Sequence, residues 1–200
     1  MESKSTRDQI VEAADRLFYQ HGFEHTSFSD IARDVQISRG NFYYHFKTKD
    51  QILDAVIEAR LGKTEAMLSD WESAGATPAD RIRCFIELLI ANKGDIIRFG
   101  CPVGTMTTEL VKLGHAAQPG ACRVLSLFRT WLRRQFERLG RAEDADALAM
   151  HLLALSQGVS TLVAAVGDEG FLHAEVDRMN HWLDTVIEGT DRAPAPALRH

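Results

Sequence analysis

The sequence predicts an all-α protein of about nine helices. Apolar residues recur at spacings of three and four along most of the 200 residues, a pattern typical of helices that bury one face. Alternating segments rich in β-branched residues, the usual sign of strands, are absent from the sequence. With 45% hydrophobic and 26% charged residues, the chain has the composition of a soluble protein with one large domain, or with a small domain joined to a larger one.

Two apolar stripes near the start of the chain predict the first two helices. The first helix is expected to end at Gly22, which suits a left-handed C-cap. The second is expected to begin after Thr26 or Ser27, since either side chain can accept hydrogen bonds from backbone N–H groups at a helix start. It should end at the polar break at Gln36. The two buried faces are expected to comprise Ile10, Ala13, Ala14, Leu17 and Phe18 in the first helix, and Phe28, Ile31, Ala32 and Val35 in the second.

The segment from Ser38 to about Phe46 predicts a third helix, with Ser38 as its N-cap. At about 100° per residue, Phe42 and Phe46 lie on one face, which can pack on the first two helices and complete a three-helix core. Two short helices separated by about three residues predict a helix-turn-helix. The opposite face of the third helix collects Gly40, Asn41, Tyr43 and Tyr44.

Six more helices are expected in the rest of the chain. Pro78 suits the first position of a helix, where its missing N–H group would have no partner in any case. A short helix with Met106 and Leu110 is expected to end before the turn at Pro119. The other four are expected at about residues 50–73, 121–139, 143–167 and 171–188.

The predicted helix at 143–167 is apolar or small on nearly every face, so it must be covered on two sides. This favours a second copy of the chain as its partner, although a central helix in a monomeric core is the alternative. Its two stripes are Leu148, Leu152, Leu155, Val159 and Leu162, and the smaller Ala145, Ala149, Ser156 and Ser160.

The outward face of the third helix carries residue types that bind DNA. Asparagine can read adenine edges, tyrosine hydroxyls and His45 can bind phosphate oxygens, and Lys47 and Lys49 add positive charge beside them. The net charge of −5, and seven Lys and Arg against eight Asp and Glu in residues 1–50, make this a local argument rather than one from total charge. The alternative is that the rings fill an interface with the rest of the chain.

The run "TRDQIVEAADRLFYQHGFEHTSFSDIARDVQISRGNFYYHFKTKDQILDAV", residues 6–56, closely resembles the DNA-binding domain of the TetR (tetracycline repressor) family. The spacing from "AADRLFYQHGF" to "YYHFKTK" is specific to that domain. Ser29 stands where some relatives carry a longer base-reading side chain, which leaves the operator sequence open. The resemblance implies DNA contacts by Ser27, Ser29, Arg39, Gly40, Asn41, Tyr43, Tyr44, His45 and Lys49, beside Lys47.

The resemblance also implies a second domain that binds a small molecule and forms a homodimer through the last two helices. We expect a DNA-binding domain at 1–48, a ligand-binding and dimerisation domain at 49–190, and a disordered tail at 191–200. Two-fold symmetry would predict a palindromic operator. The residues expected to line the ligand site are Trp71, Phe85, Phe99, Cys101, Met106, Phe128, Trp131, His151 and Gln157. His151, on an apolar stripe, is more typical of a buried histidine than of a ligand contact.

Cys101 precedes Pro102, which suits the first position of a helix, so its thiol is expected at the N-cap, where N–H groups and the helix dipole stabilise a thiolate. The phrase "GCPVGTMTTEL" resembles a TetR-like subgroup with a Gly-Cys pair, some members of which sense electrophiles or oxidants. Cys101 is therefore either a sensor or a small residue that fits a tight turn. Cys84 and Cys122 look like packing residues.

Other classes of function find little support in the sequence. No apolar run approaches the length of a membrane span, the first residues lack a signal peptide, and three cysteines without a CxxC pair suit a reducing compartment, so a cytoplasmic protein is expected. No cofactor or metal site is predicted. The enzyme alternative, a thiol enzyme using Cys101 with His115 or His151 as base, leaves the third helix unexplained.

The expected function is that of a transcription regulator and not of an enzyme. It would bind a double-stranded DNA operator, most simply as a repressor, and would be released by a small molecule or by modification of Cys101. An activator or a chromosome-organising protein is the alternative use of the same DNA-binding domain. The inducer and the regulated genes cannot be identified from the sequence.

Overall fold

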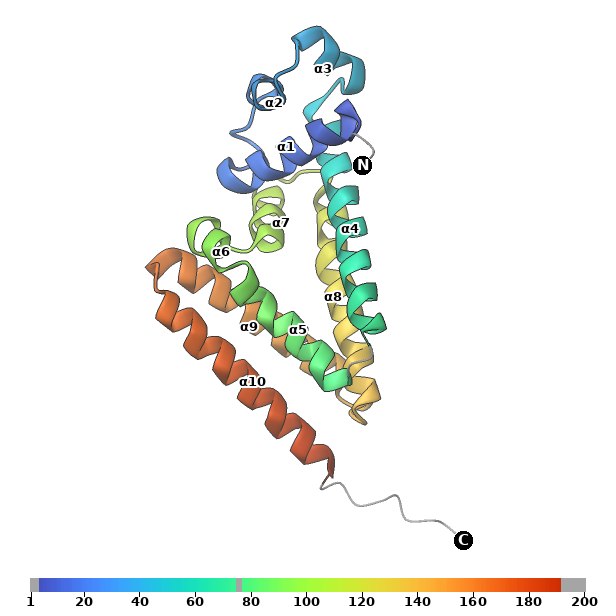
Figure 1. Cartoon of the computed structure of the whole chain (residues 1–200), viewed down its shortest axis with the longest axis vertical. Helices are drawn as coiled ribbons and strands as arrows, with labels where there is room; N and C mark the ends of the chain where they lie inside the picture. The colour runs from blue at the N-terminus through green and yellow to red at the C-terminus, as the bar shows by residue number, and fades with distance from the viewer. Residues whose placement is uncertain (1–3, 75–76, 192–200) are drawn as a thin grey trace. The chain divides into compact units, whose positions relative to one another are not determined.

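A computed structural model describes residues 4–74 and 77–191, and within them the chain is helical with no strand (Figure 1). The all-α prediction is confirmed. The described residues form ten helices, one more than the about nine expected from the sequence. Their bounds are α1 Thr6–His21, α2 Phe28–Val35, α3 Arg39–His45, α4 Lys49–Ser73, α5 Pro78–Ala91, α6 Lys93–Phe99, α7 Pro102–Lys112, α8 Gln118–Arg138, α9 Ala145–Val166 and α10 Glu169–Asp191.

Two helix starts differ from the sequence-based expectation. The additional helix, α6, follows α5 directly, because Asn92 ends one helix and begins the other. The polar "NKGD" segment thus contains only a change of helix direction. Helix α8 begins at Gln118 rather than after the "QPG" segment. Pro119 is tolerated there because the first-turn N–H groups of a helix have no partner within it.

The chain divides into two compact units that interleave along the sequence. Unit 1 comprises residues up to 67 and residues 101–127, and unit 2 comprises residues 68–100 and those from 128 onward. Helices α4 and α8 therefore each contribute residues to both units. The functional boundary at residue 48 remains a prediction, and residues 192–200, most of the expected tail, lie outside the described part of the chain.

Helices α1, α2 and α3 pack in unit 1 around the rings expected from the sequence. Phe42 and Phe46 are 1% and 2% exposed, and Ile10, Phe18 and Ile31 are buried with them. The rings of Phe28 and Phe42 lie 5.1 Å apart between centroids, which joins α2 to α3. The prediction that two phenylalanines anchor the third helix is confirmed.

The segment that follows α1 is held from two sides by charged groups. The Glu109 carboxylate, on α7, accepts hydrogen bonds from the backbone N–H groups of Phe23 and Glu24, both at 2.9 Å. The Lys49 ammonium, at the start of α4, donates to the carbonyl oxygens of the same two residues at 2.9 and 3.2 Å, and lies 4.3 Å from the Phe23 ring centroid. One α7 side chain and one α4 side chain thus fix the connection between α1 and α2.

Gly22 makes this approach possible. Its φ of 88° is a conformation that L side chains rarely adopt, and an added Cβ would lie 3.0 Å from Glu109 Oε1. The expected glycine C-cap is confirmed, although its ψ of 155° is extended rather than left-handed helical. A second polar link joins the same helices, since Arg60 donates to Asp15 Oδ1 at 2.6 Å and to the carbonyl of Pro102 at 2.5 Å.

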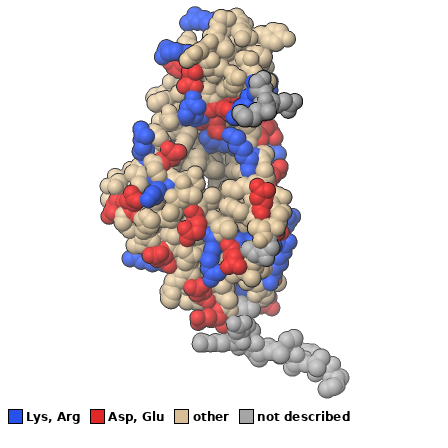
Figure 2. All heavy atoms as spheres, in the orientation of Figure 1, with Lys and Arg blue, Asp and Glu red and all other residues tan. Residues whose placement is uncertain are grey.

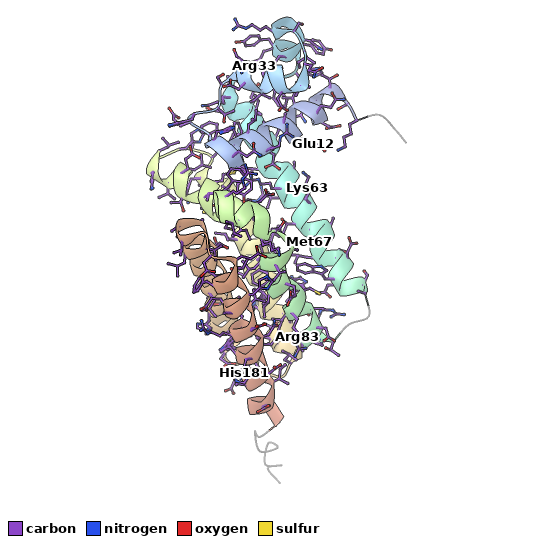
Figure 3. The ribbon with its side chains drawn as sticks, turned by 60° about the vertical axis from the view of Figure 1, so that its left-hand side comes forward. Glu12, Arg33, Lys63, Met67, Arg83 and His181 are labelled. Atoms are coloured by element: carbon purple, nitrogen blue, oxygen red, sulfur yellow. The ribbon has the colours of Figure 1, made fainter. Side chains whose placement is uncertain are left out.

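Unit 2 is built on α9, which packs against α5, α6 and α10. Arg83 on α5 lies beside α10 (Figure 3) and donates to Asp184 at 2.8 Å. By length and composition, α9 is the one helix in the described part of the chain that could cross a membrane. Core helices of water-soluble proteins pass the same criteria, and eight α9 residues are buried against protein.

Both apolar stripes of α9 contribute residues to the core. The small residues face the core, since Ala145, Ala149, Ser156 and Ser160 are at most 5% exposed. Of the leucine and valine stripe only Leu162 is exposed. The outward apolar surface of α9 instead consists of Met150, Leu162 and Val166, at 45%, 53% and 69% exposed. The small side chains among the buried residues allow neighbouring helices to approach α9 closely.

We predict that Glu109→Ala lowers the free energy of unfolding by about 2 kcal/mol, because it removes a charged acceptor from two backbone N–H groups. Glu109→Gln should recover part of this loss, since its amide oxygen can accept one of the two bonds. Urea denaturation followed by circular dichroism measures the effect.

The matched control is Glu58→Ala, which breaks a 2.7 Å ion pair with Arg123 in which both side chains are about 60% exposed. Such pairs contribute about 0–1 kcal/mol. Equal destabilisation by the two alanine variants would contradict the structural role assigned to Glu109.

Candidate nucleic-acid interface

The turn between α2 and α3 depends on one residue with an unusual backbone conformation. Gln36 has φ 59° and ψ 39°, and among the described residues it is the one non-glycine with positive φ. The N–H of Ile37 returns to the carbonyl of Ala32 at 3.1 Å, which closes the end of α2. Ser38 then begins α3 by accepting from the N–H of Asn41 at 3.2 Å. The expected polar break and the expected N-cap are both present.

Ser27, one of the two expected caps, is the N-cap of α2. Its hydroxyl accepts from the Asp30 N–H at 3.2 Å and donates to Asp30 Oδ2 at 2.6 Å, while the Ser27 N–H donates to the same oxygen at 3.0 Å. These hydrogen bonds from Ser27 hold the pKa of Asp30 below its ordinary value. Thr26, the other candidate, is buried and donates to the carbonyl of Gly22 at 2.7 Å.

Helix α3 presents most of its predicted DNA-binding residues to solvent. Arg39, Gly40 and Asn41 are exposed, and Tyr43 and Tyr44 are 46% and 78% exposed. A Cβ added at Gly40 would meet only the Ser38 hydroxyl, at 4.0 Å. Packing within the chain therefore does not require a glycine at this position, whereas close approach by an external molecule would.

Ser29 and Arg39 lie together across the helix-turn-helix. The Arg39 guanidinium donates from Nη2 to the Ser29 hydroxyl oxygen at 3.2 Å. The two residues line a hollow of about 150 Å³ between α2 and α3, and the rest of its lining is Phe28, Ala32, Phe42 and Tyr43. The short side chain at position 29 thus supports the arginine that begins α3.

The basic residues after α3 differ in what they contact. Lys47 is exposed, and its ammonium donates to the carbonyl of Tyr43 at the end of α3. His45 is half-buried, with its ring 5.2 Å from that of Tyr44. Lys49 is half-buried, and its ammonium is already bonded to the segment after α1. Of the predicted DNA contacts, Lys49 is the one whose charge most clearly serves the protein's own backbone.

On the face drawn in Figure 2, Lys and Arg side chains are interspersed with Asp and Glu. Near the N-terminus Lys4 pairs with Glu12 at 2.6 Å, and the Arg7 guanidinium lies 4.9 Å from the Phe46 ring centroid. Because residues 1–50 hold seven Lys and Arg against eight Asp and Glu, an argument for a polyanionic partner must rest on individual side chains around α3.

The predicted ligand-site residues fall into both units. In unit 2 two ring pairs form, Trp71 with Trp131 at 5.5 Å and Phe85 with Phe128 at 5.4 Å between centroids. Phe99 and Gln157 are half-buried in unit 2, while Cys101 and the buried Met106 belong to unit 1. These assignments remain predictions.

The expectation of a buried His151 is wrong. His151 is exposed beside Met150, on the outward surface of α9, and its ring lies 5.0 Å from that of Trp182 on α10. The apolar stripe on which it was placed by sequence is turned away from the core at this position. It makes no described contact with the Trp71 and Trp131 pair.

Cys101 is the N-cap of α7, as the sequence predicts. Its sulfur accepts from the Gly104 N–H at 3.4 Å, and the thiol-bearing residue is half-buried. Cys84 and Cys122 are half-buried as well, and Cys122 accepts from Gln118 Nε2 at 3.0 Å.

The structural roles of two polar residues, Glu109 and Gln135, are not apparent from the sequence. Glu109 sits on an ordinary amphipathic helix, and its partners lie 85 and 86 residues earlier in the chain. Gln135 occurs among arginines near the end of α8, yet it is 0% exposed. Gln135 lies one turn beyond the buried Trp131, and this spacing is the one local signal that could have marked it.

Comparisons with known proteins support the resemblance seen in residues 6–56. The family model described as bacterial regulatory proteins, tetR family, matches residues 10–56. The chain is 35% identical to a probable HTH-type transcriptional regulator, ArpR, of Pseudomonas putida, over 97% of this chain and 95% of that protein. It is 24% identical, with the same coverage of 97% and 95%, to the HTH-type transcriptional regulator TtgR of the same species. A TetR transcriptional regulator from Legionella pneumophila has a similar structure, with a TM-score of 0.80, 26% identity, and coverage of 92% and 98%.

We predict that Ser27→Ala lowers the free energy of unfolding by about 1 kcal/mol at neutral pH, because it removes an N-cap. The Ser27 bonds depress the pKa of Asp30 in the folded state, so their stabilisation is present above the unfolded-state pKa and is lost as pH falls through the folded-state pKa. The difference between wild type and variant should therefore shrink on acidification. Thermal unfolding from pH 7 to pH 3 measures it, and a constant difference would show that Asp30 is not coupled to the cap.

Proposed function

Because the chain belongs to the TetR family of bacterial regulatory proteins, we propose that it binds a palindromic DNA operator as a homodimer and represses transcription until a small molecule releases it. Its relatives are transcriptional regulators, not enzymes. The observation that carries the proposal is the two-sided construction of α3. Phe42 is buried on one side, while Arg39, Asn41 and Tyr44 are exposed on the other.

The outward side of α3 suits the major groove of DNA. Asn41 can make two hydrogen bonds to adenine, and Arg39 can do the same to guanine. Tyr43, Tyr44 and Lys47 can bind phosphate oxygens and set the position of the helix, with Ser27 and Ser29 at the start of α2 close to the DNA backbone. Lys49 would then act indirectly, by holding the segment after α1.

The outward surface of α9 supports a homodimer. Met150, Leu162 and Val166 are exposed and apolar, and a second copy of the same surface would remove them from water. A two-fold dimer places two α3 helices in symmetry-related positions, so the operator should consist of two inverted half-sites separated by whole helical turns of DNA.

Ligand binding would act by shifting the population of dimer geometries that fit DNA. Helix α4 is continuous from Lys49, which holds the segment after α1, to Trp71 in the ring pair of unit 2. A ligand that displaces Trp71 would therefore act on the helix that begins at the DNA-binding domain. Phe85, Phe99, Met106, Phe128, His151 and Gln157 remain candidates for other ligand contacts.

Modification of Cys101 is a second route to release. The thiol faces the start of α7, and the same helix carries Glu109, which holds the segment after α1. An adduct on the sulfur would remove its hydrogen bond from Gly104 and disturb the first turn of α7. We propose that the protein acts in the cytoplasm, where thiols stay reduced and DNA is present.

We predict that selection from a random duplex library yields an inverted-repeat operator, and that Asn41→Ala relaxes base preference at one position of each half-site, with a cost of about 1–3 kcal/mol at the preferred base. Tyr43→Phe keeps the ring beside Phe28 but removes the hydroxyl that would bind a phosphate oxygen. It should therefore lower the affinity for all DNA sequences by a similar factor. Quantitative binding to the selected operator and its single-base variants at fixed salt measures both. Failure to enrich any sequence would overturn the proposed function.

We predict that Cys101→Ser retains operator affinity within about threefold, since serine can also accept the Gly104 N–H at an N-cap. If Cys101 is a sensor, N-ethylmaleimide should release wild type from DNA and leave Cys101→Ser bound. Cys84→Ser and Cys122→Ser serve as controls for modification at the other thiols. Equal release of wild type and Cys101→Ser would eliminate the sensor role.

A further inference from the structure

A buried hydrogen-bond donor lies inside unit 2 without an acceptor. Trp131, on α8, is 5% exposed, and its indole Nε1 is shielded from solvent and has no hydrogen-bond partner among the described residues. A buried tryptophan N–H normally finds a partner, because an unpaired donor loses its hydrogen bond to water without replacement. Such a group calls for an acceptor from outside the chain, such as a ligand or an ordered water.

The surroundings of Trp131 are aromatic. The Trp71 ring lies 5.5 Å from the Trp131 ring between centroids, at an interplanar angle of 56°. Phe128 precedes Trp131 by three positions and so lies next to it on α8, and the Phe128 ring meets that of Phe85 at 5.4 Å. Aromatic walls with one well-placed polar group are typical of a small-molecule site.

The polar groups closest to Trp131 along the helix are already occupied. Gln135 donates from Nε2 to Glu72 Oε1 at 2.9 Å and to the carbonyl of Trp131 at 3.4 Å, and its own Oε1 accepts from Arg138 at 3.3 Å. Glu72 also accepts from Arg138 at 2.8 Å. These oxygen atoms bond to Gln135 and Arg138, and within the described residues none of them accepts from the indole N–H.

Two cations lie beside one anion next to the ring pair. The hydrogen bond from Arg138 at 2.8 Å holds the pKa of Glu72 below its ordinary value, and the Arg81 guanidinium lies 3.9 Å from the same carboxylate. The Arg81 Nε is also buried without a partner among the described residues. A ligand that offers a hydrogen-bond acceptor therefore fits this part of unit 2.

We propose that the indole N–H of Trp131 is the polar anchor for a planar aromatic ligand that carries a carbonyl oxygen. The aromatic part packs against Trp71 and Trp131, and the carbonyl accepts the Nε1 hydrogen bond. Trp71 is half-buried, so it forms the solvent-facing wall of the site. This inference rests on the proposed ligand-responsive function and specifies the chemical class of its ligand.

The test compares two probes of nearly the same shape, 9-fluorenone, which has a carbonyl oxygen, and fluorene, which has none. Binding to the full chain is measured by equilibrium dialysis. Wild type should bind 9-fluorenone about tenfold more tightly than fluorene, as expected for one hydrogen bond to a buried donor. Trp131→Phe keeps an aromatic ring but loses the donor, so the ratio should fall to about one while fluorene affinity is retained.

The control variant is Trp182→Phe, which changes a half-buried tryptophan that contacts Phe136 and His151 instead. It should leave the tenfold ratio intact. Equal affinity of wild type for the two probes, an unchanged ratio in Trp131→Phe, or no saturable binding of either probe would each overturn the proposal. An ordered water as the permanent partner of Trp131 would give the first of these results.

A second measurement does not depend on folding of Trp131→Phe. The ¹⁵N-labelled wild type has three tryptophans and therefore three indole N–H resonances. The resonance that remains in the spectra of both Trp71→Phe and Trp182→Phe belongs to Trp131. It should move downfield with 9-fluorenone and not with fluorene, and an unmoved resonance would overturn the proposal. Operator selection is independent of both measurements, so loss of DNA binding would overturn the regulator proposal while leaving the ligand site standing.

Discussion

The hydrogen bonds that hold the segment after α1 determine how the helix-turn-helix is presented. Glu109 binds its N–H groups and Lys49 binds its carbonyls, so the peptide units of Phe23 and Glu24 cannot rotate without breaking bonds on both sides. Helix α2 begins a few residues later, at Phe28. The position of α2, and of α3 packed against it, therefore depends on a carboxylate from α7 and an ammonium from α4. A change in either helix must be accommodated by this segment.

The same hydrogen bonds explain why the charged residues around α3 have different roles. The Lys49 ammonium donates to two carbonyl oxygens and lies over a ring, so it would have to break these contacts to bind a phosphate oxygen. Lys49 therefore contributes more to the stability of the fold than to DNA binding. Among the described residues, the Arg39 guanidinium donates to one hydroxyl group, that of Ser29, and Asn41 is exposed to solvent. The side chains with the weakest internal bonds are thus those on the outward face of α3, which is what recognition of an external molecule requires.

Local features of this chain were predictable from its sequence and distant partnerships were not. Ser38 and Cys101 cap their helices as expected, because a cap depends on residues within one turn. The burial of Phe42 follows from helical period for the same reason. Glu109 is different, since its role depends on a glycine and two N–H groups more than 80 residues away. The prediction that His151 is buried is wrong because helical periodicity alone does not determine which side chains of a largely apolar helix face outward.

The stripes of α9 show why this ambiguity has a physical answer. Helices α5, α6 and α10 all pack on α9, and three close neighbours need small side chains between them, so Ala149 and Ser160 belong inside. Met150 and Leu162 are then turned outward by the geometry of the helix. Large apolar residues on the outside of a helix whose inside is already filled are removed from water when another chain covers them. Close packing within one copy and the proposed association with a second copy therefore draw on different residues of the same helix.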